Sequence, residues 1–245
     1  MWTKNSVLDV RGCGGRLRLP PPVKQRPETR NQVLPLLFFL FIAYTYTINT
    51  YMNTLIITAN SKKENHSALI ANTYKEEKEK KGDTVDIWSL YDEKYMLPYL
   101  TFDEHTPEYI AKINMVHARM MEADEIVFVH PIWWSLMPAI MKNFLDTVLS
   151  PHFAYLYDKG NVKPMLTGKT AKIFATAGSH APYFTIPIVR EFTPLFIVWK
   201  YAILGFCGMK VNSIMVCDKM NINDSCPPEG CVECFLEKVK KSARE

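Results

Sequence analysis

Residues 125–138 read EIVFVHPIWWSLMP, an apolar run followed directly by two adjacent tryptophans and a proline. The first six residues have the length and the β-branched and aromatic content of a strand that is buried on both faces. Pro138 then stands in the first turn of a predicted helix that continues to Leu149. The stretch therefore predicts a strand, a short aromatic loop and a helix, which is the repeating unit of a parallel sheet.

The same alternation extends to both sides of this stretch. Further strands are expected at 53–59, 84–90, 170–176 and 211–217, and further helices at 65–81, 106–122, 189–206 and 229–241. Residues 150–168 are expected to form a long loop. Five strands that alternate with helices predict an α/β fold, a doubly wound parallel sheet covered on both faces. The flavodoxin-like strand order 2-1-3-4-5 is the expected order for five strands.

Residues 1–51 differ in composition from the rest of the chain. Residues 1–32 are basic and rich in proline and glycine, so we expect disorder there. Residues 33–51 carry no charge and are just long enough for a membrane anchor, whereas the long leading region argues against a signal peptide. An anchor with its basic flank in the cytoplasm would place the domain outside, away from cytosolic cofactors. We therefore expect a cytoplasmic domain over 52–245 that begins at Met52, with membrane association through 33–51 as the minority interpretation.

The charge balance of the domain excludes one class of partner. The chain has 29 basic and 25 acidic residues, of which residues 1–51 contain seven and two. Residues 52–245 therefore contain 22 basic and 23 acidic residues and are close to neutral. A nucleic-acid partner is not expected, because such proteins carry a clear basic excess.

The cysteines are concentrated near the carboxyl end. Cys226, Cys231 and Cys234 have the spacing C-x4-C-x2-C, which zinc or an iron–sulfur cluster could use if a fourth ligand such as Cys217 were nearby. The body of the domain from 52 to 206 has no cysteine, which favours reduced thiols and a cytosolic protein over a disulfide framework. We expect no metal.

Ligands of doubly wound sheets bind beyond the carboxyl ends of the strands, where the strand order reverses. This rule selects the loops over residues 59–67, 129–138 and 176–183. The first loop is polar and leads into a helix N-terminus, a combination that binds phosphate, although Asn65 or Ser67 could equally serve as a simple helix cap. The second loop contains Trp133 and Trp134. They could contact a planar ring, or one could pack in the core while the other forms a dimer contact. The third combines small residues, which let a ligand approach the backbone, with His180 and Tyr183 as proton donors.

Four stretches together resemble a known family, the flavodoxin-like NAD(P)H:quinone oxidoreductases, which include bacterial general-stress and potassium-efflux-associated members. Residues 131–142 are similar to the family's aromatic flavin loop and the helix after it, and residues 166–169 and 176–179 resemble the segments around its fourth strand. Residues 204–208, LGFCG, are similar to a late segment of the family. The resemblance covers nearly all of residues 52–220 and none of 1–51.

The resemblance implies a two-electron, ping-pong hydride transfer from NAD(P)H through FMN or FAD to a quinone or a related acceptor, in a homodimer. It implies an acceptor-side role for Tyr183, and we add His180 as the second candidate catalytic residue. The family's first loop has other residues at Asn60 and His66, but the hydrogen-bonding character of the loop is kept. The expected cofactor-binding residues are Asn60, Asn65, His66, Ser67, Pro131, Ile132, Trp133, Trp134, Ser135, Thr176, Ala177, Gly178 and Ser179.

Two alternative functions remain open from the sequence. A regulatory flavin- or nucleotide-binding subunit of a membrane potassium-efflux system would use the same fold. An electron-carrier flavodoxin would also do so, although such carriers are usually strongly acidic and this domain is not. The apolar residues Phe192, Phe196, Val198, Trp199 and Tyr201 fit either a dimer contact or the core.

Overall fold

The computed structural model describes residues 51–62, 65–101, 105–178, 184, 186–218 and 232–245. These residues belong to a compact unit that runs from Thr50 to Glu245. The basic segment 1–32 and the apolar run 33–51, except for Tyr51, lie outside the described residues. Within the described ranges, no helix combines the length and the apolar character that crossing a bilayer requires.

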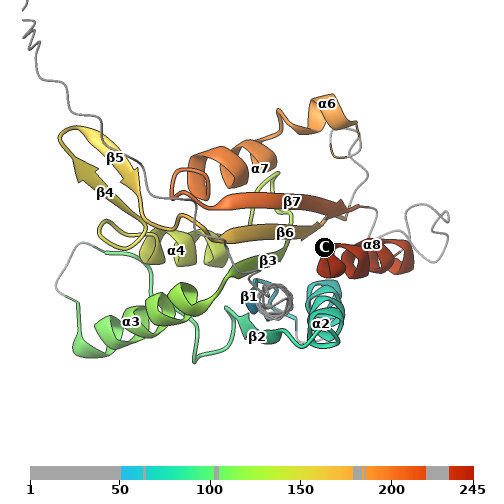
Figure 1. Ribbon diagram of the computed structural model, residues 1–245, viewed down its shortest axis with the longest axis horizontal. Coiled ribbons are helices and arrows are strands. Elements are labelled where there is room, and N and C mark those ends of the chain that lie inside the picture. The colour runs from blue at the N-terminus through green and yellow to red at the C-terminus, as the bar shows by residue number, and fades with distance from the viewer. Residues whose placement is uncertain (1–50, 63–64, 102–104, 179–183, 185, 219–231) are drawn as a thin grey trace, which may run out of the picture. The chain divides into compact units, whose positions relative to one another are not determined.

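Five parallel strands form the central sheet in the order β2-β1-β3-β6-β7, which confirms the predicted order 2-1-3-4-5 (Figure 1). They are β1 (Asn53–Thr58), β2 (Thr84–Ser89), β3 (Glu125–Pro131), β6 (Thr170–Thr176) and β7 (Lys210–Cys217). β1 pairs in parallel with β2 on one side and with β3 on the other. The strand order therefore reverses next to β1, and the loops after β1 and β3 diverge at that point.

Helices cover both faces of the sheet, and their ends follow local sequence signals. Helices α2 (His66–Glu79) and α8 (Val232–Arg244) lie side by side on one face (Figure 1), and α3 (Pro107–Glu122) and α4 (Ala139–Val148) belong to the other. The Asn65 side chain accepts a hydrogen bond from Ala68 N at 2.8 Å and caps α2. Thr106 caps α3 in the same way ahead of Pro107. These are the usual ways of satisfying free N–H groups at a helix start.

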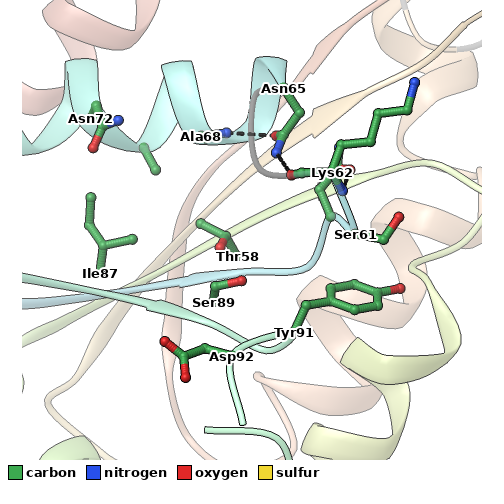
Figure 2. A pocket seen from close by; sticks show the side chains of 12 residues that line it. Thr58, Ser61, Lys62, Asn65, Ala68, Asn72, Ile87, Ser89, Tyr91 and Asp92 are labelled. Carbon is green, nitrogen blue, oxygen red and sulfur yellow. Dashed lines mark hydrogen bonds between the residues drawn. The ribbon is translucent and has the colours of Figure 1, made fainter. Parts of the chain in front are cut away.

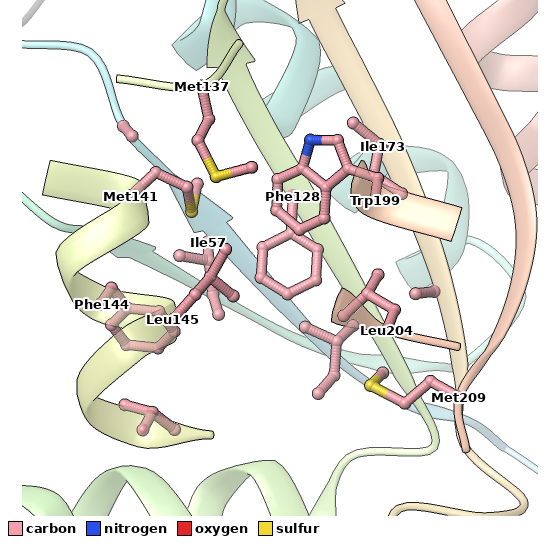
Figure 3. Close-up of a cluster of buried hydrophobic side chains, with 14 of the residues drawn as sticks. Ile57, Phe128, Met137, Met141, Phe144, Leu145, Ile173, Trp199, Leu204 and Met209 are labelled. Atoms are coloured by element: carbon pink, nitrogen blue, oxygen red, sulfur yellow. The ribbon is translucent and has the colours of Figure 1, made fainter. Parts of the chain in front are cut away.

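The alternation of side chains along each strand divides the core into two clusters. On β1, Leu55 and Ile57 point into one cluster and Ile56 points into the other. Phe128 of β3 lies in the larger cluster with Ile57 and side chains of α4 (Figure 3). Because the central strands are buried on both faces, their sequences are continuously apolar rather than alternating. This explains why residues 126–129 could be recognised as a strand.

The structure corrects the prediction of a long loop over residues 150–168. A two-stranded antiparallel hairpin forms there, with β4 (Tyr155–Asp158) and β5 (Asn161–Pro164). Lys159 and Gly160 have φ angles of 49° and 83°, the left-handed pair that a tight two-residue turn requires. The glycine at the second position is the sequence signal for this turn.

The structure also corrects the predicted continuous helix over 189–206. This region is divided into α6 (Pro187–Arg190), α7 (Pro194–Ile197) and a π-helix, η1 (Val198–Ile203). Pro194 has no N–H to donate and forces the preceding Thr193 into an extended conformation with ψ 149°, so α6 cannot continue. Phe196 and Trp199 enter the core, whereas Phe192 and Tyr201 are exposed.

A cluster of charged side chains is buried at the amino-terminal ends of the strands. Lys78 Nζ lies 2.9 Å from Asp83 Oδ2 and 3.6 Å from Glu125 Oε2, and Lys172 Nζ lies 3.5 Å from Glu125 Oε1. Tyr74 donates a hydrogen bond to Glu125 Oε2 at 2.6 Å. Burial, together with the Glu125 carboxylate, raises the pKa of Tyr74 well above its ordinary value, so the phenol remains a donor. Glu125 is thus the shared partner of three buried groups.

Replacing this carboxylate should destabilise the domain strongly. We expect Glu125→Gln to lower the free energy of unfolding by about 3–5 kcal/mol, because the buried Lys172 ammonium loses its carboxylate and the buried Lys78 ammonium keeps Asp83 but loses Glu125. Urea denaturation of the variant and the wild type measures this difference. Glu79→Gln is the matched control, because Glu79 pairs with Lys75 at 2.8 Å on the exposed surface of α2 and should cost less than about 1 kcal/mol. Equal losses in the two variants would contradict the prediction.

Candidate functional site

Three loops converge on a pocket of ≈ 480 Å³ at the carboxyl ends of β1, β3 and β6. They are the three loops that the topology rule selected from the sequence. The side chains that line the pocket are Asn60, Ser61, Lys62, Asn65 and His66 after β1, Pro131, Ile132 and Trp133 after β3, and Thr176, Ala177 and Gly178 after β6. The pocket therefore combines polar and amide groups, an aromatic wall and small residues.

The loop after β1 is held by its own side chains. Asn60 Oδ1 accepts a hydrogen bond from Lys62 N at 3.2 Å, and Asn60 Nδ2 donates to Ser67 Oγ at 3.5 Å. Asn65 Nδ2 donates to Lys62 O. These contacts bring the start of helix α2 to the pocket, and no acidic residue stands in the first turn of that helix. Helix N–H groups, the helix dipole and Lys62 all favour an anion here.

The loop between β3 and α4, residues 132–138, contains a tight turn. Trp133 and Leu136 exchange backbone hydrogen bonds of 2.9 and 3.1 Å, and the two residues between them, Trp134 and Ser135, have φ angles of 50° and 66°. Residues other than glycine rarely adopt this left-handed conformation, which costs of order 1–3 kcal/mol for each residue. Such strain is a recognised feature of ligand-binding loops.

The turn gives the two tryptophans different environments. Trp133 lines the pocket and is 47% exposed, whereas the Trp134 side chain is 99% exposed and does not line it. An indole that is almost completely exposed loses the hydrophobic stabilisation that burial would provide. Both rings thus present exposed apolar surface, Trp133 within the pocket lining and Trp134 at the next position of the turn.

Most of the predicted cofactor-binding residues come together in the structure. Nine of them line the pocket: Asn60, Asn65, His66, Pro131, Ile132, Trp133, Thr176, Ala177 and Gly178. Ser67 is buried behind the loop, and Trp134 and Ser135 lie on the turn outside the pocket lining. Ser61 and Lys62 join the site although they were not selected, and their position in the loop after β1 was the available signal. Ser179, His180 and Tyr183 lie outside the described residues.

A second pocket of ≈ 500 Å³ shares the loop after β1 and lies between α2 and β2 (Figure 2). Asn60, Ser61, Lys62 and Asn65 line both pockets. The far side of the second pocket is formed by Asn72, Ile87, Ser89 and Asp92, which the sequence analysis did not select. Asp92 Oδ1 accepts a hydrogen bond from Lys94 N at 3.0 Å, which orders the loop after β2.

His130 is buried directly before the pocket-lining Pro131. Its Nε2 atom accepts a hydrogen bond from Trp199 Nε1 at 3.2 Å, and its Nδ1 atom lies 2.9 Å from Pro131 O. An indole N–H can only donate, so Nε2 carries no proton and Nδ1 donates to the carbonyl. Burial lowers the pKa of His130 to about 4, which is consistent with a neutral ring.

The described residues offer no metal site: none of the His, Cys, Asp and Glu residues in them gather in a group of three or more that could hold an ion. Cys226 and Cys231 of the cysteine-rich segment lie outside the described ranges.

Comparison with known proteins identifies relatives of this domain. A family model described as a flavodoxin-like fold matches residues 52–234. The chain is similar to an uncharacterized NAD(P)H oxidoreductase of Haemophilus influenzae, with 34% identity over 137 residues that cover 53% of this chain and 66% of the relative. It is also similar to an FMN-dependent NADH:quinone oxidoreductase 3 of Bacillus anthracis, with 30% identity over 139 residues that cover 56% and 60%.

A solved structure has the same fold over a larger range. The crystal structure of Smu.1420 from Streptococcus mutans UA159 superimposes with a TM-score of 0.62 at 29% identity and covers 79% of this chain and 99% of its own. In the two sequence matches, by contrast, the chain spans less than two thirds of each relative's length.

The buried imidazole should make stability depend on pH. In the unfolded chain His130 takes up a proton near its ordinary pKa of 6.5, whereas in the folded protein it stays neutral down to about pH 4. The unfolded state binds more protons in this window, so the free energy of unfolding falls as the pH decreases through it. His130→Gln does not titrate, and its loss of stability between pH 7 and pH 4.5 should be smaller by about 2 kcal/mol. Urea denaturation across this range tests the prediction, which fails if both proteins lose the same stability.

Proposed function

The chain belongs to the flavodoxin-like family, and from this premise we propose that it is an NAD(P)H-dependent flavin oxidoreductase that reduces quinones or related acceptors. One observation carries the proposal. The loop after β1, which is suited to bind phosphate, and the aromatic loop after β3 line the same pocket, where the strand order reverses. The names of the two relatives, an NAD(P)H oxidoreductase and an NADH:quinone oxidoreductase, support the reaction class.

The donor set of the pocket fits a flavin nucleotide. The loop from Asn60 to His66 and the N-terminus of α2 would hold the phosphate, because they offer amide and backbone donors without a nearby first-turn carboxylate. Thr176, Ala177 and Gly178 have little side-chain bulk and would let the ring approach the backbone. Trp133 would form an aromatic wall on which the ring could pack.

We assign Trp134 to the mouth of the same site. Its strained backbone holds the indole in solvent beside the pocket, where a bound ring or a bound substrate would cover it. Ser135 would contact the cofactor through the same turn. Neither side chain lines the pocket in this structure, so the two assignments require that a bound ligand extends beyond the pocket to reach the turn.

FMN is the proposed cofactor, since a relative is FMN-dependent, and FAD remains the alternative. When bound, the flavin would supply the hydride-accepting centre that links NAD(P)H to the acceptor. The chain's own part is to hold the ring, to fix the phosphate and to exclude water beside the indoles. Tyr183 is proposed as the group nearest the acceptor on the grounds of the resemblance, and His180 is proposed as a second proton donor because it belongs to the same sequence segment, 176–183.

We further propose a homodimer that functions in the cytoplasm. Ile188, Phe192 and Tyr201 on and around α6 and η1 are 73%, 75% and 58% exposed. Several large apolar side chains exposed within one short stretch of the chain are typical of a protein–protein contact. A second copy of the chain is the partner that the family resemblance implies.

The working domain is proposed to begin at Met52, which is also where the family match begins. Met52 N donates a hydrogen bond to Asp83 Oδ1 at 2.9 Å, and Lys78 Nζ contacts Met52 Sδ at 3.6 Å. If Met52 were the first residue, its ammonium group would lie against the Asp83 carboxylate. A start at this position would keep these two contacts and would remove the exposed Tyr51 ring that lies against Gly82.

Flavin binding is the direct test of the proposed function. We expect the purified protein to be yellow, to oxidise NAD(P)H with a quinone and to quench FMN fluorescence on titration. Trp133→Ala and Trp134→Ala should each weaken the Kd for FMN about fivefold, because an aromatic contact contributes on the order of 1 kcal/mol.

Tyr99→Ala serves as the control for these two variants, since Tyr99 is 77% exposed and lies outside both pockets. Its Kd for FMN should equal that of the wild type. A wild-type protein that stays colourless after reconstitution with FMN and with FAD would overturn the proposed function. A yellow protein whose Kd is unchanged by both tryptophan variants would remove the indoles from the site.

A shortened protein tests the proposed start. The chain from Met52 to Glu245 should fold and bind FMN with a Kd within about twofold of the full chain, because the contacts of β1 all lie within that range. Circular dichroism and FMN titration of both proteins measure this. Loss of folding or of flavin in the shortened protein alone would show that residues 1–51 contribute to the fold.

A further inference from the structure

We propose that His130 positions the loop that follows β3, by fixing the Pro131–Ile132 peptide group, and that Trp199 holds His130 in the tautomer which this task requires. Neither His130 nor Trp199 lines the pocket, so both act through the backbone of residues that do. The consequence for flavin binding rests on the proposed function, whereas the effect on the peptide group does not.

The peptide group between Pro131 and Ile132 is held from both ends. Its carbonyl oxygen accepts a hydrogen bond from His130 Nδ1 at 2.9 Å, and its N–H donates to Thr176 O at 2.7 Å. Because a peptide group is planar, two bonds on opposite sides fix its rotation. This peptide group ends one residue before the aromatic turn that begins at Trp133, so its orientation contributes to the direction in which Trp133 leaves the sheet.

Trp199 determines which nitrogen of His130 can donate. Its indole N–H donates to Nε2 and therefore leaves the proton on Nδ1, facing Pro131 O. Both rings are completely buried, and Trp199 also packs against Phe128 with ring centroids 4.7 Å apart. A buried imidazole with both nitrogens satisfied has a single orientation and a single tautomer.

The position of Trp199 depends on the π-helix η1. Leu204 N donates to Trp199 O at 3.2 Å, the five-residue spacing that defines this wider turn. Gly205 allows it, since a Cβ atom there would lie only 2.4 Å from the carbonyl oxygen of Lys200. Single π-turns are uncommon and are frequent at functional sites. Here the π-turn carries Trp199, whose side chain connects η1 to the pocket loop through His130.

The proposal predicts a local effect that differs from simple destabilisation. Replacing His130 by phenylalanine keeps an aromatic ring in the core but leaves Pro131 O and the Trp199 N–H without their partners. Buried polar groups without partners are costly, so the peptide group is expected to turn towards water. Trp133 and the turn behind it would then move relative to the loop after β1.

The first arm of the experiment measures the peptide group in the full chain without flavin. Hydrogen exchange at the Ile132 amide is followed by NMR in protein with isotopically labelled isoleucine. His130→Phe should speed exchange at Ile132 at least tenfold, and Trp199→Phe should have a smaller effect in the same direction. His130→Gln should restore slow exchange in part, because a side-chain amide can donate to the carbonyl and accept from the indole.

The matched control is Phe128→Leu. Phe128 lies on the same strand and the same face and packs on the same indole, but it makes no side-chain hydrogen bond to the loop. This variant should lower the melting temperature about as much as His130→Phe while leaving exchange at Ile132 close to that of the wild type. Melting temperatures of all four variants are recorded so that the comparison is made at matched stability.

The second arm measures the Kd for FMN by fluorescence quenching, together with the visible circular dichroism of the bound flavin. His130→Phe should weaken FMN binding about tenfold and alter the dichroism, whereas Phe128→Leu should change neither. Wild-type exchange at Ile132 in His130→Phe, or equal acceleration in Phe128→Leu, would overturn the proposal. If the wild type bound no flavin, the proposed function would fail, and the first arm would still decide whether His130 positions the loop.

Discussion

The parallel pairing of β1 with β3 is the constraint on which the site depends. The pairing continues to Thr58 and Val129, and the N–H of Ala59 still donates to Val129 O at 3.0 Å after β1 has ended. The two chains therefore leave the sheet at the same level and diverge, one towards α2 and the other towards α4. No side chain has to create the cleft between them, because it follows from the strand order.

The two ends of the sheet differ in the burial and the strain of their residues. At the amino ends, Glu125 joins buried lysines and a tyrosine into a rigid base. At the carboxyl ends, strained residues such as Trp134 are almost completely exposed to solvent. A fold can carry such strain only where the surrounding structure determines the geometry, and the hydrogen-bonded peptide group after Pro131 provides that determination.

The sequence was sufficient to predict the sheet, because continuous apolar runs such as 126–129 and caps such as Thr106 are local signals. It also located the three loops, since strand ends fix where loops meet. It failed over residues 150–168, where Gly160 is the signal for the turn, and over 189–206, where Pro194 ends one helix and the π-turn at Trp199 has no signal in composition. The directions of Trp133 and Trp134 depend on unusual backbone angles, and periodicity does not encode them.

Because the tryptophans differ in burial, their intrinsic fluorescence can report on the loop after β3. Of the tryptophans in the described part of the chain, Trp88 and Trp199 are buried, while Trp133 in the pocket lining and Trp134 next to it in the chain are accessible. In a protein that begins at Met52 and so lacks Trp2, an aqueous quencher such as iodide would therefore reach Trp133 and Trp134 but not the buried pair, whose emission would remain as a constant background. Changes in the quenchable fraction report events at this one location without any attached dye.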